Sequence, residues 1–196
     1  MMYRGAVVVA FLVVFTGGAA LAGTITGVSG LINVPTTATV NADYLTASVH
    51  LFSGQAVASL TVGVAELVEV GVYTTNRSGP MSLTAKGVVV PESGDAPGVA
   101  VGLDGGATYM VFSRDFKSAK GYLGIGGRYG NIFAGLAMQI AGEGLSGDTK
   151  MTLMLEHDGR NVNLGARFNF LSLIDLDIAL LNMEQFAAGL TLKTQF

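Results

Sequence analysis

Apolar and polar residues alternate along most of this chain, and the alternation is cleanest near its end. Between Gln185 and Phe196, every second side chain falls on the same face of an extended backbone. The more apolar face holds Phe186, Ala188, Leu190, Leu192, Thr194 and Phe196. The pattern predicts a β-strand with one apolar and one polar face. It ends on an aromatic residue, as the last strand of a bacterial outer-membrane barrel usually does.

Similar patterns, separated by turn residues, recur along the chain and predict an all-β fold. We expect strands at residues 44–52, 55–64, 67–75, 81–90, 98–104, 107–114, 120–128, 131–140, 150–157, 160–170, 173–181 and 185–196. An even number of antiparallel strands suits an up-and-down transmembrane β-barrel of about 12 strands. Splitting or merging a hairpin would change this to 10 or 14.

The predicted connections are mostly short. Ser53-Gly54, Gly105-Gly106 and Asp158-Gly159 are residue pairs that favour tight hairpins. Residues 107–114 leave their faces unassigned, because Tyr109 competes with its neighbour Met110 for the apolar side.

The composition favours lipid as the environment of the apolar faces. Half of the residues are apolar and only 13% are charged, whereas about 25% is usual for soluble domains. The charged residues fall on the less apolar face of their strands, so we expect them to face the lumen. These candidates are Glu69, Lys86, Asp104, Arg128, Arg167, Asp175, Asp177 and Lys193. The alternative is a soluble secreted β-sandwich with these charges on its wet outer face.

The first residues predict export. Arg4 precedes the apolar run Ala6–Phe15, and Ala20-Leu21-Ala22 fits a signal-peptidase site. We therefore divide the chain into a signal peptide (1–22), an N-terminal segment (23–42) and a barrel (43–196). The chain has no cysteine, which excludes lipoprotein modification and disulfides. The expected location is the outer membrane, with its lipid as a partner.

The N-terminal segment is a poor central strand. Pro35 lacks a backbone donor, while Asn33 and Thr36 favour a turn. We predict that this segment enters the barrel mouth or lies inside it as a short plug.

Few residues suggest chemistry. His50 and His157 lie far apart in the sequence, and no nucleophile or phosphate-binding loop accompanies them. Asp175 and Asp177 share one strand face and could form a cation site, although pairing with Arg167 or Lys193 explains them better. We therefore predict no catalytic residues, no cofactor and no metal. The net charge of −3 argues against a nucleic-acid partner.

Two stretches resemble the YjbH-like exopolysaccharide biosynthesis family. The segment from Gly30 to Thr36 is similar to the family's G-L-I-N-x-P-T signature, and the segment from Leu155 to Gly165 is similar to its E-Y-D-G-R-D-V-N-x-G segment. The matching positions include Gly30, Leu31, Ile32, Asn33, Pro35, Thr36, Glu156, Asp158, Gly159 and Arg160. The resemblance implies an outer-membrane barrel associated with polysaccharide production or export, with polysaccharide or its secretion machinery as a partner.

The residues themselves allow a structural explanation of both motifs. On that explanation, Asp158-Gly159 is a hairpin turn that Glu156 and Arg160 flank as a cross-strand pair. For the whole chain we expect a non-catalytic outer-membrane barrel associated with exopolysaccharide biosynthesis or secretion. The alternatives are a porin-like channel for small solutes, an enzyme embedded in a barrel and the soluble sandwich.

Overall fold

Twelve antiparallel strands close into one barrel, which confirms the predicted fold class. The structure is a computed structural model that describes residues 23–77, 80–94, 96–128, 130, 132–140 and 149–196. The predicted signal peptide lies outside these residues. Among the described residues, no helix is long and apolar enough to cross a membrane.

The observed strands lie close to the predicted ones. They are β1 Tyr44–Phe52, β2 Gln55–Ala65, β3 Val68–Thr75, β4 Ser82–Val90, β5 Gly98–Asp104, β6 Ala107–Asp115, β7 Lys120–Gly126, β8 Ile132–Ile140, β9 Lys150–His157, β10 Val162–Phe170, β11 Ile174–Leu181 and β12 Gln185–Gln195. Strand β7 ends earlier than predicted because Gly126 and Gly127 both adopt positive φ.

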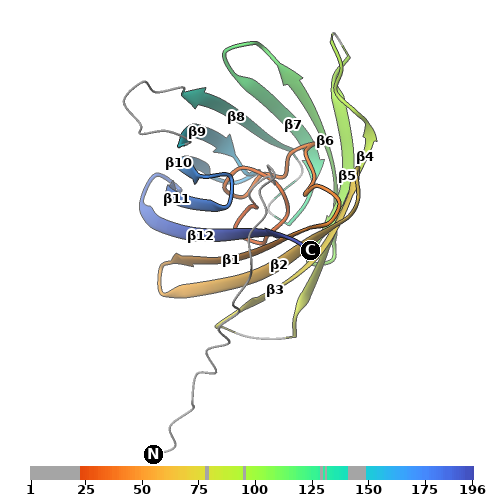
Figure 1. Cartoon of the computed structure of the whole chain (residues 1–196). Helices are drawn as coiled ribbons and strands as arrows, with labels where there is room; N and C mark the ends of the chain where they lie inside the picture. Colours follow the sequence, from red (N-terminus) through yellow and green to blue (C-terminus); the bar gives the residue numbers. More distant parts are fainter. Residues whose placement is uncertain (1–22, 78–79, 95, 129, 131, 141–148) are drawn as a thin grey trace, which may run out of the picture.

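The barrel closes between its first and last strands, so no sheet edge remains open. Tyr44 of β1 pairs with Gln195 of β12, and the amide of Phe196 donates to the carbonyl of Asp43 over 3.0 Å. We call the end of the barrel that contains these residues the terminal end, and the opposite end the turn end. Figure 1 shows the closed ring, with β12 beside β1.

Two of the three tight hairpins that we predicted form at the turn end. The third prediction was wrong. Phe52 pairs with Gln55 and Asp104 with Ala107, so both of these loops have two residues. The third loop is longer, because His157 pairs with Val162.

The carboxylate of Asp158 explains this longer loop. It accepts hydrogen bonds from the amides of Arg160 and Asn161 (3.1 and 2.9 Å) and thereby folds the loop on itself. Glu156 consequently pairs with Asn163, and the expected cross-strand pair with Arg160 does not form.

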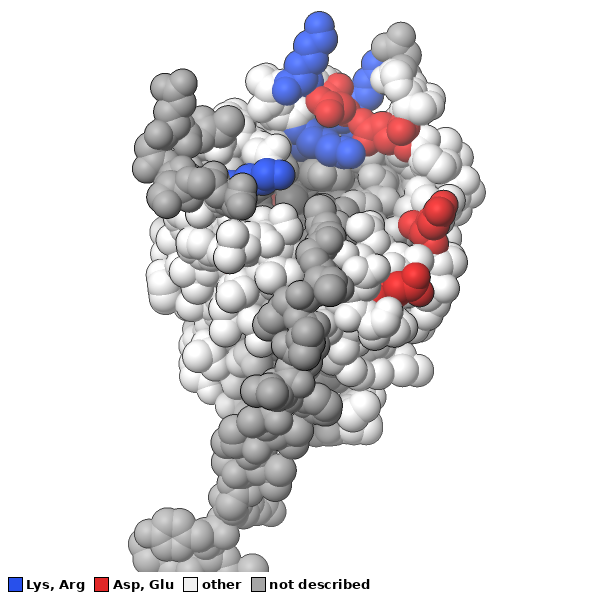
Figure 2. Space-filling model, viewed as in Figure 1, with Lys and Arg blue, Asp and Glu red and all other residues white. Residues whose placement is uncertain are grey.

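The alternation of side chains separates an apolar wall from a polar lumen. Along β11, for example, Ile178 is exposed on the outside while Asp177 is buried inside. The structure also settles the faces of β6: Tyr109 and Val111 face the interior, and Phe112 is exposed on the outside. In Figure 2, the charged side chains gather toward the upper and right edges of the visible face and leave most of the wall on that face uncharged.

The lumen is filled by the chain itself. Residues 23–43, here called the lumenal segment, lie within the ring of strands, as the orange trace in Figure 1 shows. Its apolar residues Ile25, Leu31 and Val34 are buried in one cluster with Phe133 and Met154 of the barrel. Gly63 permits a close approach at the end of the segment, because a Cβ there would lie 1.9 Å from the carbonyl oxygen of Asn41.

Candidate functional site

The charges predicted to face the lumen all lie in ion pairs of opposite sign. Burial of an unpaired charge is strongly unfavourable, so the pairing is what allows them inside. The pairs are Glu69 with Lys86 (3.2 Å), Asp104 with Arg128 (3.8 Å), Asp177 with Arg167 (2.7 Å) and Asp175 with Lys193 (2.7 Å). The two aspartates of β11 are therefore partners of cations.

The pair formed by Glu69 and Lys86 holds the lumenal segment at two points, Ser29 and Val40. The Glu69 carboxylate accepts hydrogen bonds from the amides of Ser29 and Val40, over 2.9 and 2.7 Å, and from the Ser29 hydroxyl. Lys86 donates to the carbonyl of Ser29 over 2.7 Å. Both strand residues are almost completely buried, so the segment supplies the polar partners that water would otherwise provide.

Arg167 holds a second part of the segment. Its guanidinium forms a bidentate pair with Asp177, with N–O distances of 2.7 and 3.2 Å. The remaining donors bind the backbone carbonyls of Gly23, Gly30 and Leu31 over 2.9–3.0 Å. Arg167 thus joins β10, β11 and the lumenal segment in one network.

Glu156 forms the third attachment, and it brings the two family-like motifs together. Its carboxylate accepts hydrogen bonds from three successive amides of the segment, those of Ile32, Asn33 and Val34, over 2.8–3.1 Å. An anion that receives converging backbone amides is strongly held. The motif around Gly30–Thr36 is therefore bound directly by the motif around Glu156.

The neighbouring residues of the second motif complete this attachment. Asn33 donates to Asp158 over 3.2 Å, and Asn163 bridges Glu156 and Asp158 over 2.9 and 3.0 Å. Gly159 has a φ of 100° in the turn, whereas the Arg160 side chain is exposed. Within this motif, Glu156 and Asp158 contact the segment and Arg160 points to solvent.

Hydroxyl groups add contacts along the rest of the segment. Thr26 donates to Asp104 over 3.0 Å, and Thr61 donates to the carbonyl of Gly27 over 2.8 Å. Thr37 and Ser113 lie 2.6 Å apart through their hydroxyl oxygens. The segment is thus held by polar contacts from several sides of the barrel.

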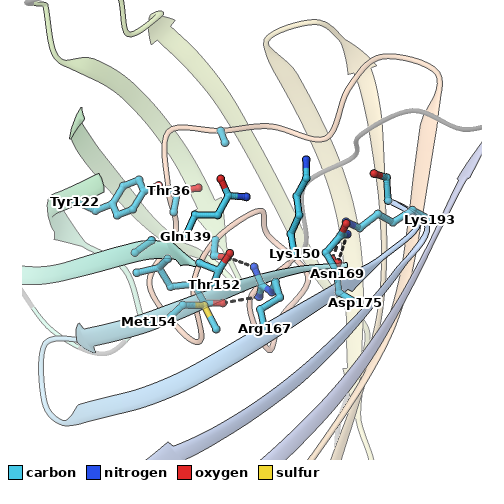
Figure 3. A pocket seen from close by; sticks show the side chains of 15 residues that line it. Thr36, Tyr122, Gln139, Lys150, Thr152, Met154, Arg167, Asn169, Asp175 and Lys193 are labelled. Atoms are coloured by element: carbon cyan, nitrogen blue, oxygen red, sulfur yellow. Dashed lines mark hydrogen bonds and ion pairs between the residues drawn. The ribbon is translucent and has the colours of Figure 1, made fainter. Parts of the chain in front are cut away.

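A cavity of about 240 Å³ remains at the terminal end of the lumen. It lies between the lumenal segment and the inner faces of β7 to β12, as Figure 3 shows. Its charged lining residues are Lys150, Arg167, Asp175 and Lys193, and its neutral polar ones include Gln139 and Asn169.

A much smaller cavity lies on the other side of the segment, toward the turn end. The cavity beside Asn33, Val34 and Pro35 measures about 20 Å³, which is room for about one water molecule. The Glu156 attachment borders this region through Asp158. A solute entering from the terminal end therefore meets the lumenal segment before it reaches the turns.

The histidines lie apart. His50 is buried, 3.4 Å from Asp177, and His157 is exposed and accepts a 3.3 Å hydrogen bond from the Gly159 amide. Within the described parts of the chain, no group of three or more His, Cys, Asp or Glu residues could hold a metal ion.

Sequence reasoning missed the role of Glu92, which lies between β4 and β5. Its carboxylate is 2.7 Å from Lys120 and accepts hydrogen bonds from the Ser113 hydroxyl and the Asp115 amide, both over 2.6 Å. Partial burial alone would raise the pKa of Glu92, but the contacts with Lys120, Ser113 and Asp115 lower it below its usual value. No local pattern marks Glu92, because its partners come from two other strands.

Solved structures share this fold, although sequence comparison finds no relative. No family model and no curated protein matches the chain. A KdgM porin superposes with a TM-score of 0.54 and 9% identity, covering 78% of this chain and 99% of the porin. The Acinetobacter baumannii outer membrane protein Omp33 gives a TM-score of 0.47 and 9% identity, covering 78% and 97%. The first likeness shows that the chain shares the β-barrel fold of this porin.

Proposed function

We propose that this protein is a porin-like passage for small solutes in an outer membrane, and that its lumenal segment holds the passage closed. The apolar outer wall suits lipid, and the likeness to a porin supports a channel architecture. The polar lumen suits hydrated solutes.

The observation that carries this proposal is the way in which the segment is held. Glu69, Glu156 and Arg167 bind its backbone through hydrogen bonds. Water can replace such contacts, so the same side chains would become the hydrated lining of an open lumen once the segment leaves. A segment held by an apolar core alone would leave a dry lumen instead.

Conductance across planar bilayers tests the proposal. The mature chain from Gly23 onward is refolded and compared with a variant that lacks residues 24–40. We expect the intact protein to be closed most of the time and the deletion variant to give steady ion current, because the deletion empties the lumen.

A point substitution provides a sharper version of the same test. Glu156→Gln removes the charge that binds three amides of the segment, so we expect more frequent opening than in the intact protein. Glu184→Gln, on the exposed turn before β12, is the matched control and should behave like the intact protein. A deletion variant that inserts into the bilayer but carries no current would refute the proposed channel.

A second candidate is a role in exopolysaccharide secretion, based on the resemblance of the two motifs. The contact between Glu156 and the amides of residues 32–34 favours a joint role for these motifs. The test is the amount of surface polysaccharide in cells that lack the protein, with and without the intact chain supplied in trans. Unchanged polysaccharide would exclude this candidate.

A further inference from the structure

We propose that the cavity at the terminal end binds a small solute bearing an oxyanion, a carboxylate or a phosphate, through Lys150. The inference rests on the proposed function, because it names the class of solute that the passage would accept. Three cations and one carboxylate line the cavity.

The three cations differ in the number of ion pairs and hydrogen bonds that their side chains already form within the protein. Lys193 is paired with Asp175 at 2.7 Å, and Arg167 is committed to Asp177 and to three backbone carbonyls. Lys150, at the start of β9, is exposed, and its side chain forms no ion pair or hydrogen bond with any residue that the structure describes. Among the described residues that line the cavity, Lys150 is therefore the cation whose charge no ion pair neutralises.

The neutral groups around Lys150 suit the remainder of such a solute. Gln139 and Asn169 contribute amides and Thr36 contributes a hydroxyl to the lining. Figure 3 shows the Lys150 ammonium and the Gln139 amide extending from the strand wall toward the same side of the cavity. Amides and hydroxyls can donate to oxyanion oxygens, so the cation does not have to bind the solute alone.

The surroundings strengthen the attraction and limit the size of the ligand. Walls of low dielectric focus the field of a charge in a cleft, which raises the local concentration of oppositely charged solutes. The volume of about 240 Å³ lies below the range of about 300–1,000 Å³ that is typical of drug-sized ligands. A small organic anion or inorganic phosphate fits this space, whereas a polymer segment of several sugar units does not.

Calorimetric titration of the refolded mature protein in neutral detergent tests the inference. The probes are succinate, inorganic phosphate and the uncharged polyol erythritol. We expect saturable binding of succinate or phosphate and much weaker binding of erythritol. If succinate and phosphate both bind, the site recognises the shared oxyanion; if only one binds, the site is selective within that class.

Substitutions of Lys150 test whether the anion binds in this cavity. Lys150→Gln should weaken anion binding about tenfold or more, since a charge-assisted hydrogen bond is lost, and Lys150→Arg should restore it. Lys117→Gln, in the loop between β6 and β7 and outside the cavity lining, is the matched control and should bind like the intact protein. Added salt should weaken binding, because it screens the attraction.

Three results would overturn the inference: no saturable anion binding by the intact protein, undiminished binding by Lys150→Gln, or erythritol binding as tight as that of the anions. Titration of the closed protein requires no current, so its failure is distinguishable from failure of the proposed channel. A silent deletion variant would refute the channel while leaving a Lys150-dependent binding site in place.

Discussion

A charged residue inside the barrel is tolerated there because it has a partner of opposite charge. Lys86 and Glu69 have side-chain exposures of 0% and 2%. Each would be costly to bury alone, and the pair is stable because it is also bonded to the backbone of Ser29. Sequence alternation places both residues on the lumenal face, but it does not reveal that a segment from the start of the chain completes their coordination.

Removing one charge of this pair should lower the free energy of unfolding more than removing both charges does. Lys86→Met leaves the Glu69 carboxylate buried without its cation, and we expect a loss of about 3–5 kcal/mol in the free energy of unfolding. The double variant Lys86→Met/Glu69→Gln should recover part of this loss, because no lone charge remains. Urea unfolding in lipid vesicles measures the free energies.

The double-mutant cycle decides between coupled and independent residues. If the effects of Lys86→Met and Glu69→Gln simply add, the ion pair makes no energetic contribution of its own.

Glu92 should make the loop between β4 and β5 sensitive to acid. Its folded-state pKa lies below the usual value of 4.5, so its contacts stabilise the folded state fully above that pH. This contribution is lost as the pH falls through the lowered pKa, when the carboxylate becomes protonated.

The chemical shift of the Asp115 amide, which donates to Glu92, reports this titration. We expect its transition midpoint to lie below pH 4.5 in the intact protein and the transition to be absent in Glu92→Gln. A midpoint at or above 4.5 would contradict the proposed stabilisation of the carboxylate.

At the scale of elements, alternation alone predicted the strands well. β1, β5 and β9 have the predicted bounds, because period-two patterning and tight turns are local properties of a sequence. The turn after β9 was predicted wrongly, because Asp158 folds it through side-chain hydrogen bonds that add two residues to the loop. β6 was ambiguous, because both of its faces are apolar, and only the burial of Tyr109 and Val111 decided which one faces inward.

The orientation of β11 gives a direct test of its lipid-facing side. Ile178 lies on the outer face, so Ile178→Arg should lower the free energy of unfolding by about 2–4 kcal/mol. Met183→Arg, in the turn that follows β11, should cost about 0–1 kcal/mol, as expected near the membrane boundary. Urea unfolding of both variants in vesicles measures the difference. Equal effects would show that β11 does not face the membrane core.

At the scale of the whole molecule, the barrel should not depend on the lumenal segment for closure. The strands pair with one another around the complete ring, and β1 pairs with β12 through residues that follow the segment. Removal of residues 24–40 should therefore leave a closed barrel with lower thermal stability, because Glu69, Glu156 and Arg167 lose bonded partners.

Gel mobility before and after heating tests this expectation, since a closed barrel resists detergent until it is heated. We expect the deletion variant to retain the heat-dependent shift, with a lower transition temperature than the intact protein. Loss of the shift in unheated samples would show that the segment is required for folding, and deletion could then not be used to test conductance.

The sequence by itself determined the strands, the two faces of those that alternate cleanly and the class of fold, because each depends on the period of side chains along an extended backbone. It also placed eight charges on the polar faces, which the structure joins in four ion pairs. Only the tertiary structure decided which charges pair, how the segment around Gly30–Thr36 is bound by Glu156, and where space remains beside Lys150. These contacts join residues up to more than a hundred positions apart, and their geometry follows from barrel closure and strand register, which local patterns do not encode.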